Sequence, residues 1–287
     1  MRVRFHMPIA ALALASLAAC GGNGESIPQL AAAQGASLSA CTALATSFTH
    51  ASTALTAASV VTSGTLTNAG QPVGEHCRVT GRMNQRTSTV DGQTYAIGFE
   101  MRLPKDWSGR FLYQGNGGTD GVVSTADGGN SIGSGGLLRN GLQLGFAIIS
   151  SDAGHTAAQN PLFGLDPQAR LDYGYQAVGT LTPMAKALVR AAYGRDADRS
   201  YIAGTSNGGR HAMVAAARLA DQYDGYLAHS PGFNLPRAAA AKPPMSTYRT
   251  PPFDSAFGHA HAIVRDSEGF WSGVADPRAR VGSAAGG

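Results

Sequence analysis

A serine between two glycines is the strongest chemical signal in this chain. Residues 204–208 read Gly-Thr-Ser-Asn-Gly, a G-x-S-x-G pattern that follows an apolar run at 200–203 and precedes a helix-compatible run at 210–218. A nucleophile elbow requires this strand–turn–helix order, because its sharp turn leaves room only for small residues beside the serine. In such a turn Ser206 would attack an acyl carbonyl, and backbone N–H groups would stabilise the developing oxyanion. The pattern alone is weak in a chain with 38 glycines, where a glycine-rich turn with a surface serine is the alternative.

Alternating strand and helix patterns surround this turn. Residues 144–151 form a nearly continuous apolar run, which is typical of a strand buried on both faces. A helical pattern covers 173–193, with Pro183 as a kink or boundary, and a further buried strand is predicted at 224–231. Strands that alternate with helices predict right-handed βαβ units and a parallel sheet.

The segments on either side have different patterns. Residues 28–60 are rich in Ala, Ser, Thr and Leu and predict one helix with loops. Residues 77–82 and 95–104 alternate apolar and polar side chains, as half-buried antiparallel strands do. Proline pairs interrupt the chain after residue 241, and residues 253–287 show no clear strand pattern.

The first residues have the features of an export signal. Arg2 and Arg4 precede an apolar stretch at 7–19 that is too short to span a bilayer. The stretch ends in Leu-Ala-Ala-Cys, which resembles the lipobox of bacterial lipoproteins and predicts lipidation at Cys20. An ordinary secretory signal that ends in cysteine is the alternative. Both predict export, and the lipobox adds a periplasmic or cell-surface lipoprotein with an outer-membrane anchor.

Four segments follow from these patterns. They are a signal peptide with lipobox at 1–20, a flexible tether at 21–38, an α/β core at 39–241 and a low-order tail at 242–287.

Two cysteines remain for the exported chain. In an oxidising compartment we expect Cys41 and Cys77 to form a disulfide, with two buried free thiols as the alternative. The chain has no CxxC or HExxH pattern and its histidines are dispersed, so we expect no metal and no cofactor.

Charge gives little support for a macromolecular partner. The formal net charge is +4 and the basic residues are scattered without interleaved aromatics, which argues against nucleic-acid binding. We expect a small-molecule ester as the partner, and membrane contact only through the lipid anchor.

Several linked motifs together resemble the tannase and feruloyl esterase family of α/β-hydrolases. The resemblance extends over about residues 40–240, and its carriers are the motifs at 109–118, 151–155, 186–194, 200–210 and 224–231. It implies hydrolysis of aryl, hydroxycinnamoyl or similar small esters. It also implies that the core at 39–241 is an α/β-hydrolase-like, mostly parallel sheet with helices on both faces, and we expect this sheet to be incomplete, without the lid and the last strands.

The resemblance assigns roles to the glycine-rich motifs. Ser206 is the nucleophile, and the N–H of Asn207 is one oxyanion donor. The second donor comes from the Gly-Asn-Gly-Gly loop at 115–118, where we expect Gly117, with Gly118 as the neighbouring alternative. A plain glycine turn remains the other interpretation of that loop.

Two departures from the family pattern affect the mechanism. Thr205 stands where many members have a cysteine that bonds to a cysteine beside the catalytic histidine. The family also places its Asp and His partners far after the serine, whereas only 81 residues follow Ser206. The available acids and bases, none of them after a convincing strand, are Asp254, Asp266, Asp276, His259 and His261.

Other candidates lie nearer the core. His155 and Asp152 belong to a Ser-Asp-x-Gly-His motif after a predicted strand, and we expect them to shape the pocket or, alternatively, to supply the base. His211 follows the elbow and is expected to face away from the Ser206 hydroxyl, while His229 could line the pocket.

Three functional hypotheses remain. The first is an exported serine ester hydrolase that works through an acyl-enzyme. The second is a truncated, catalytically inactive hydrolase-like lipoprotein without the Asp and His partners. The third is a surface lipoprotein that binds glycan or protein, against which the oxyanion loop argues.

Overall fold

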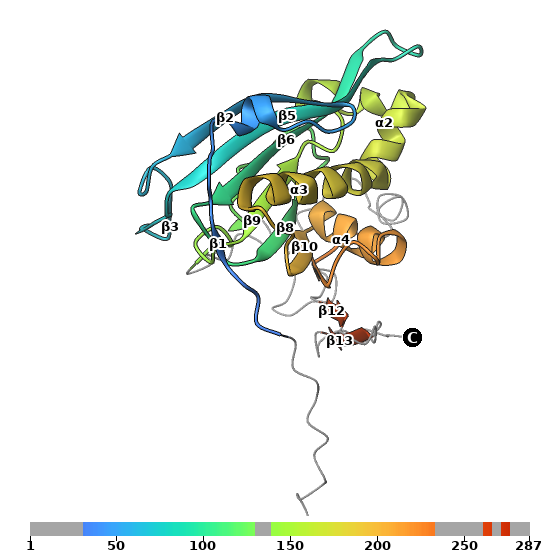
Figure 1. Cartoon of the computed structure of the whole chain (residues 1–287). Coiled ribbons are helices and arrows are strands. Elements are labelled where there is room, and N and C mark those ends of the chain that lie inside the picture. The colour runs from blue at the N-terminus through green and yellow to red at the C-terminus, as the bar shows by residue number, and fades with distance from the viewer. Residues whose placement is uncertain (1–30, 130–138, 233–260, 266–270, 276–287) are drawn as a thin grey trace, which may run out of the picture. The chain divides into compact units, whose positions relative to one another are not determined.

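A computed structural model describes residues 31–129, 139–232, 261–265 and 271–275, the last two ranges as backbone strands (Figure 1). The described residues from Ala32 onward belong to one compact unit. Within the described ranges, we find no helix with the length and apolar character needed to cross a membrane.

A nine-stranded sheet carries the fold, in the order β13-β12-β11-β10-β8-β9-β6-β5-β2. Its strands are β2 (Thr53–Val61), β5 (His76–Thr87), β6 (Thr94–Pro104), β8 (Arg110–Gly115), β9 (Ala147–Ser151), β10 (Arg199–Thr205), β11 (Gly225–His229), β12 (His261–Arg265) and β13 (Trp271–Ala275). The four strands β9, β8, β10 and β11 are parallel, and the other pairs are antiparallel. The sheet is therefore mixed, with its parallel part at the predicted βαβ units.

Short elements complete the described chain. The helices are α1 (Leu44–Ser47), α2 (Pro167–Leu171), α3 (Ala177–Tyr193) and α4 (Asn207–Arg218), with 3₁₀ turns at Ala157–Gln159 and Leu162–Leu165 and a π turn at Asp172–Gln176. Two small antiparallel pairs are β1 (Ala36–Ser37) with β7 (Asp106–Trp107), and β3 (Thr67–Asn68) with β4 (Gln71–Pro72).

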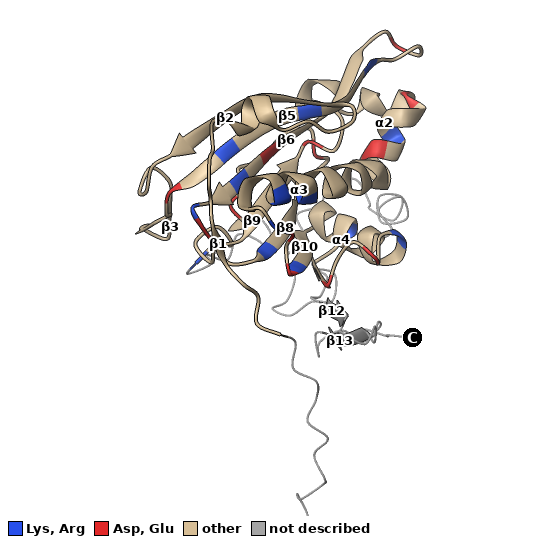
Figure 2. Ribbon diagram, viewed as in Figure 1, with Lys and Arg blue, Asp and Glu red and all other residues tan. Residues whose placement is uncertain are grey.

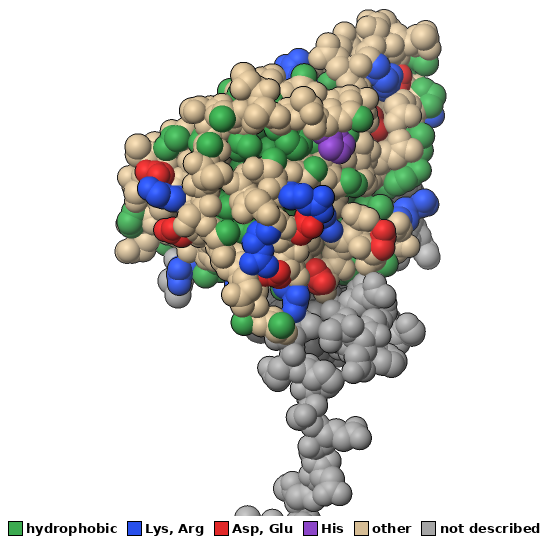
Figure 3. All heavy atoms as spheres, viewed as in Figure 1, with side chains coloured by type: hydrophobic (Ala, Val, Ile, Leu, Met, Phe, Trp, Pro, Cys, Tyr) green, Lys and Arg blue, Asp and Glu red, His purple; other side chains and the backbone are tan. Residues whose placement is uncertain are grey.

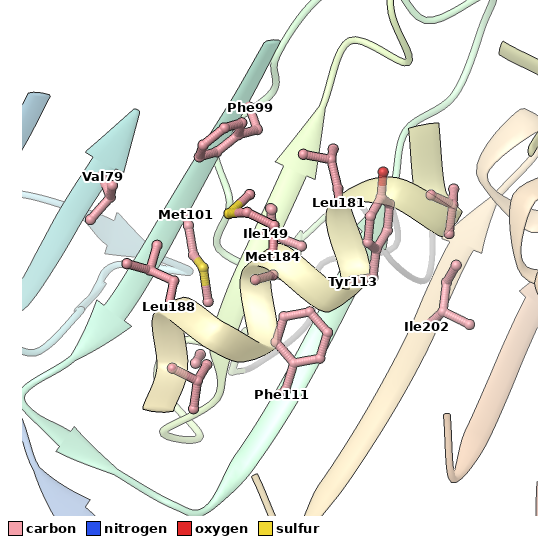
Figure 4. Packing of buried hydrophobic residues seen from close by; sticks show 14 of the residues in the cluster. Val79, Phe99, Met101, Phe111, Tyr113, Ile149, Leu181, Met184, Leu188 and Ile202 are labelled. Atoms are coloured by element: carbon pink, nitrogen blue, oxygen red, sulfur yellow. The ribbon is translucent and has the colours of Figure 1, made fainter. Parts of the chain in front are cut away.

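Helix α3 covers one face of the sheet. In Figure 4, Leu181 and Met184 of α3 lie over Phe111 and Tyr113 of β8, and all four belong to one buried cluster. Ala212 of α4 belongs to the same cluster. Burial of these side chains is the main favourable contribution to folding, and each fully buried large apolar side chain stabilises by about 1.5–3 kcal/mol.

Loop segments cover the opposite face in the described residues. Leu112 and Ile148 point to this face and pack with Ala126 and Leu142. Strands β8 and β9 are apolar on both faces for this reason, which explains their continuous apolar runs. The expectation of helices on both faces is thus met on one face within the described ranges.

The parallel strands bring two loops together. Because β8 and β10 are parallel neighbours, the loop after Gly115 and the turn after Thr205 leave the sheet at the same edge. The end of β11 lies beside them, since Thr205 pairs with His229. This edge is where ligands bind in open α/β sheets.

Four sequence predictions differ from the structure. The stretch 28–60 is predicted to hold one helix with loops, and helix α1 is present, but strand β2 begins at Thr53 because pairing with β5 overrides the modest helix preference of its alanines. Pro183, predicted to mark a kink or a boundary, lies inside α3, so the boundary alternative is wrong. Strands β12 and β13 lie in 253–287, where no strand pattern was recognised. Strand β1 likewise falls within the predicted tether at 21–38.

Charged side chains of both signs are intermixed. Figure 2 shows basic and acidic residues along the same elements, and Figure 3 shows them side by side on one face. Ion pairs such as Arg190–Asp196 and Arg195–Asp198 account for part of this pattern. The face shown therefore offers no broad surface of a single charge.

The predicted disulfide is present between Cys41 and Cys77, both buried, and closes a separation of 36 residues. We expect the double variant Cys41→Ala/Cys77→Ala to lose about 3–4 kcal/mol of unfolding free energy, because the unfolded chain regains loop entropy. Urea denaturation checks this, with the oxidised and reduced parent chain as the matched pair. Equal midpoints for all three samples would contradict a stabilising role.

Candidate active site

Ser206 occupies a strained turn between β10 and α4. Its backbone has φ 59° and ψ −118°, and its side chain is exposed. The Ser206 N–H donates to the carbonyl of His229 at 3.0 Å, and its own carbonyl accepts from the N–H of Arg210 and of Gly232. Positive φ is uncommon outside glycine and is concentrated at functional sites. The turn therefore has the strained geometry of a nucleophile elbow.

Backbone contact at the elbow explains its glycines. A Cβ on Gly204 would lie 2.4 Å from the carbonyl carbon of Gly208, and a Cβ on Gly208 would lie 2.2 Å from the carbonyl oxygen of Gly115. Real Cβ atoms do not come that close to backbone atoms. The start of α4 thus packs directly on the end of β8, where the glycine-rich loop begins.

The glycine-rich loop lies against the elbow. Asn116 is buried and its Nδ2 donates to Ser150 Oγ at 2.9 Å and to the carbonyl of Ser151 at 2.8 Å. The next residue, Gly117, is exposed, and a Cβ there would lie 3.8 Å from the carbonyl oxygen of Thr205. Gly117 is therefore a close neighbour of the residue before Ser206. Gly118 adopts φ 66°, and a Cβ atom added to it would meet no neighbouring atom within 4 Å.

Asn207 begins α4 and has a buried side chain, which is 2% exposed. Its Oδ1 accepts from the Tyr173 hydroxyl at 3.2 Å and from Arg210 Nε at 2.6 Å. Its backbone N–H is one of the first four of the helix, which have no acceptor within the helix. Helix N-termini attract negative charge for this reason.

Asp120 links the glycine-rich loop to α4. Its Oδ2 accepts from Asn207 Nδ2 at 2.6 Å and from His211 Nε2 at 2.8 Å, and both carboxylate and imidazole are at most 3% exposed. Sequence reasoning did not single out Asp120 or Tyr173, although an acid inside a glycine-rich loop was a usable signal. The sequence predicts that His211 faces away from the Ser206 hydroxyl, and the hydrogen bond of its ring to Asp120 agrees with that orientation.

His155 lies beneath the glycine-rich loop. It is 1% exposed, its Nε2 is 3.0 Å from the carbonyl oxygen of Thr119, and its ring stacks on Phe163 with centroids 3.8 Å apart. Burial lowers the pKa of His155, so the ring is neutral near pH 7. These contacts suit a side chain that supports the loop.

Asp152 supports the same loop from the end of β9. Its Oδ1 accepts from the N–H of Gly98 and of Gly154, each at 2.9 Å, and its carbonyl accepts from the N–H of Gly121 at 3.0 Å. Burial raises the pKa of Asp152 to about 7, although the two backbone N–H groups oppose the shift.

The arrangement can be compared with known proteins. Residues 77–250 match the family model described as "Tannase and feruloyl esterase". This chain belongs to that family.

Relatives and solved structures agree with this membership. A mono(2-hydroxyethyl) terephthalate hydrolase from Piscinibacter sakaiensis is 45% identical over 172 residues, 57% of this chain and 28% of that protein. A probable feruloyl esterase B-2 from Aspergillus flavus is 34% identical over 136 residues, 47% of this chain and 24% of that protein. Feruloyl esterase B from Aspergillus oryzae superposes with a TM-score of 0.56 at 26% identity, over 68% of this chain and 37% of that chain. The chain thus spans about a quarter to a third of the curated relatives it matches, and its α/β-hydrolase-like fold is confirmed.

Thr205, at the position where many members of the tannase and feruloyl esterase family carry cysteine, contacts a histidine. Its Oγ1 lies 3.2 Å from His229 Nδ1, and both residues are half-buried. This places the His229 ring beside the elbow, as expected for a side chain that lines the site.

Among the described residues, no histidine forms a hydrogen bond with the Ser206 hydroxyl, as the family's catalytic base would. Each of the five histidines with described side chains has its hydrogen-bond contact with a residue other than Ser206. His261 lies in β12, of which only the backbone is described, and the remaining candidates lie outside the described residues, namely Asp254, Asp266, Asp276 and His259.

Proposed function

We propose that this chain is an exported carboxylic ester hydrolase of the tannase and feruloyl esterase type with Ser206 as its nucleophile. The observation that carries the proposal is the exposed Ser206 at φ 59°, with the loop that holds Gly117 packed against the same turn. A strained serine next to two sets of backbone N–H groups is the arrangement that acyl transfer needs.

The proposed reaction follows from this geometry. Ser206 Oγ attacks the ester carbonyl while a base takes the hydroxyl proton, and the oxyanion accepts hydrogen bonds from the N–H groups of Asn207 and Gly117. The intermediate collapses, the alcohol leaves with that proton, and an acyl-enzyme remains. Water then attacks the acyl carbonyl, which releases the acid and restores the Ser206 hydroxyl.

The substrate class is a small ester of an aromatic acid. The relatives named for mono(2-hydroxyethyl) terephthalate and for feruloyl esters support this class, since both names refer to aromatic acyl groups. The Cys41–Cys77 disulfide supports export, because such bonds persist in oxidising compartments. Lipidation of Cys20 and an outer-membrane anchor remain part of this proposal and rest on the N-terminal pattern.

One observation favours the second candidate, an inactive hydrolase-like lipoprotein. No described imidazole is hydrogen-bonded to the Ser206 hydroxyl, and without a base a serine is a weak nucleophile near pH 7. The contacts of His155 and Asp152 support a structural role for both. His259 and His261, whose side chains lie outside the described part of the chain, remain candidates for the base that the first candidate needs.

The deciding experiment measures hydrolysis of p-nitrophenyl acetate and methyl ferulate by the chain without residues 1–20. We expect saturable turnover of both esters, with methyl ferulate preferred, because an aromatic acyl group gains binding energy that acetate lacks. A chain with a folded circular-dichroism spectrum and no turnover above buffer would instead support the inactive lipoprotein.

A further inference from the structure

We infer that Asp120 is a positioning residue that fixes the two backbone N–H donors of the oxyanion hole relative to each other. This inference rests on the proposed function, since it concerns the N–H groups of Gly117 and Asn207. Those two groups come from different elements, the loop after β8 and the first turn of α4. Asp120 is the side chain that joins these elements through hydrogen bonds.

Asp120 forms hydrogen bonds with both residues that carry the donors, Asn207 and Gly117. Its side chain accepts from Asn207 Nδ2 at 2.6 Å, so it holds the residue that carries one donor. Its own N–H bonds to the carbonyl of Gly117 at 3.3 Å, which closes a turn of the loop that carries the other donor. Asp120 adopts φ 56°, a strained value that these contacts maintain. A displacement of Asp120 would therefore move Gly117 relative to Asn207.

His211 secures the carboxylate from the next turn of α4. Its Nε2 donates to Asp120 at 2.8 Å, and its Nδ1 is buried without a partner among the described residues. A buried carboxylate is costly unless donors satisfy it, and here two side chains of one helix do so. His211 thus fixes the acid without contacting the Ser206 hydroxyl in the described hydrogen bonds.

A second set of contacts holds Asn207 from the other side. Arg210 Nε donates to Asn207 Oδ1 at 2.6 Å, and its guanidinium lies 4.5 Å from the centre of the Tyr173 ring. The Tyr173 hydroxyl donates to the same Oδ1. With Oδ1 fixed by these groups and Nδ2 fixed by Asp120, the Asn207 side chain has a single orientation. Catalytic donors need this support, because a displacement of about 1 Å can cost 10²-fold in rate.

The test combines kinetics with a measurement that does not need activity. We expect Asp120→Ala, which removes the acceptor oxygen for Asn207 and His211, to lower kcat for p-nitrophenyl acetate by roughly 10- to 100-fold with KM within about twofold, because the hole acts mainly on the transition state. Hydrogen exchange of the amides at 116–121 should accelerate by about tenfold or more, because the loop loses its tie to α4.

Two variants separate positioning from general damage. His211→Gln keeps a side-chain N–H donor and should retain kcat within about threefold, whereas His211→Leu should resemble Asp120→Ala. Asp166→Ala is the matched control, because the Asp166 side chain is similarly buried but binds Arg86 instead. It should lower stability with kcat and exchange at 116–121 unchanged.

The outcomes distinguish this inference from the proposed function. An active parent chain whose kcat and loop exchange are unchanged in Asp120→Ala would overturn the positioning role and leave the hydrolase proposal intact. A parent chain without turnover would overturn the hydrolase proposal, and faster exchange at 116–121 in Asp120→Ala would still support Asp120 as the link between loop and helix.

Discussion

Ser206→Ala is expected to lower kcat/KM for p-nitrophenyl acetate by about 10³-fold or more, because the substitution removes the only atom proposed to form the acyl-enzyme. The fold should be unaffected. The side chain is exposed and no described hydrogen bond involves its hydroxyl, while alanine at φ 59° has a similar backbone cost to serine.

Steady-state hydrolysis by the purified variant checks this expectation, together with its thermal midpoint. Ser47→Ala is a suitable control, since Ser47 is an exposed serine at the end of α1. It should keep the activity of the parent chain. Equal hydrolysis by the Ser206→Ala variant and the parent would show that the reaction occurs elsewhere.

Gly208→Ala is expected to destabilise the fold by roughly 3 kcal/mol or more, at the upper end of the usual cost of overpacking. The new methyl group would lie 2.2 Å from the carbonyl oxygen of Gly115, a backbone atom of a central strand. No flexible side chain can move aside there, so either β8 or α4 must shift. The shift would also displace the glycine-rich loop that follows β8.

Urea denaturation compares this variant with Gly164→Ala. Gly164 lies in a 3₁₀ turn with no atom within 4 Å of its Cβ direction, so its substitution should change stability by less than about 0.5 kcal/mol. A Gly208→Ala midpoint equal to that of the parent chain would mean that the elbow does not pack on the end of β8 as described.

The parallel strands and the elbow were predictable from the sequence. Buried strands such as β9 and β11 have continuous apolar runs because both of their faces are covered, and this signal is local. The elbow was recognisable because close backbone contact at Gly204 and Gly208 restricts the residue type. The Cys41–Cys77 disulfide was predictable because only two cysteines remain after Cys20 and the chain is expected to enter an oxidising compartment.

Other features depend on contacts between distant residues. The Asp120–Asn207 hydrogen bond joins residues 87 apart, and no local pattern reports such a pair. Strand β2 is rich in alanine, serine and threonine and becomes a strand through pairing with β5. Helix α3 continues through Pro183, since its apolar face is held by the sheet, which offsets the lost hydrogen bond.

The most direct measurement is covalent labelling of the chain with a fluorophosphonate, followed by mass spectrometry of its peptides. An activated serine displaces the fluoride and keeps the phosphonyl group on its Oγ. We predict one adduct per chain, on the peptide that contains Ser206, and none on the Ser206→Ala variant. A folded parent chain that takes up no label, or that is labelled on a different serine, would contradict the assignment of Ser206 as the nucleophile of an ester hydrolase.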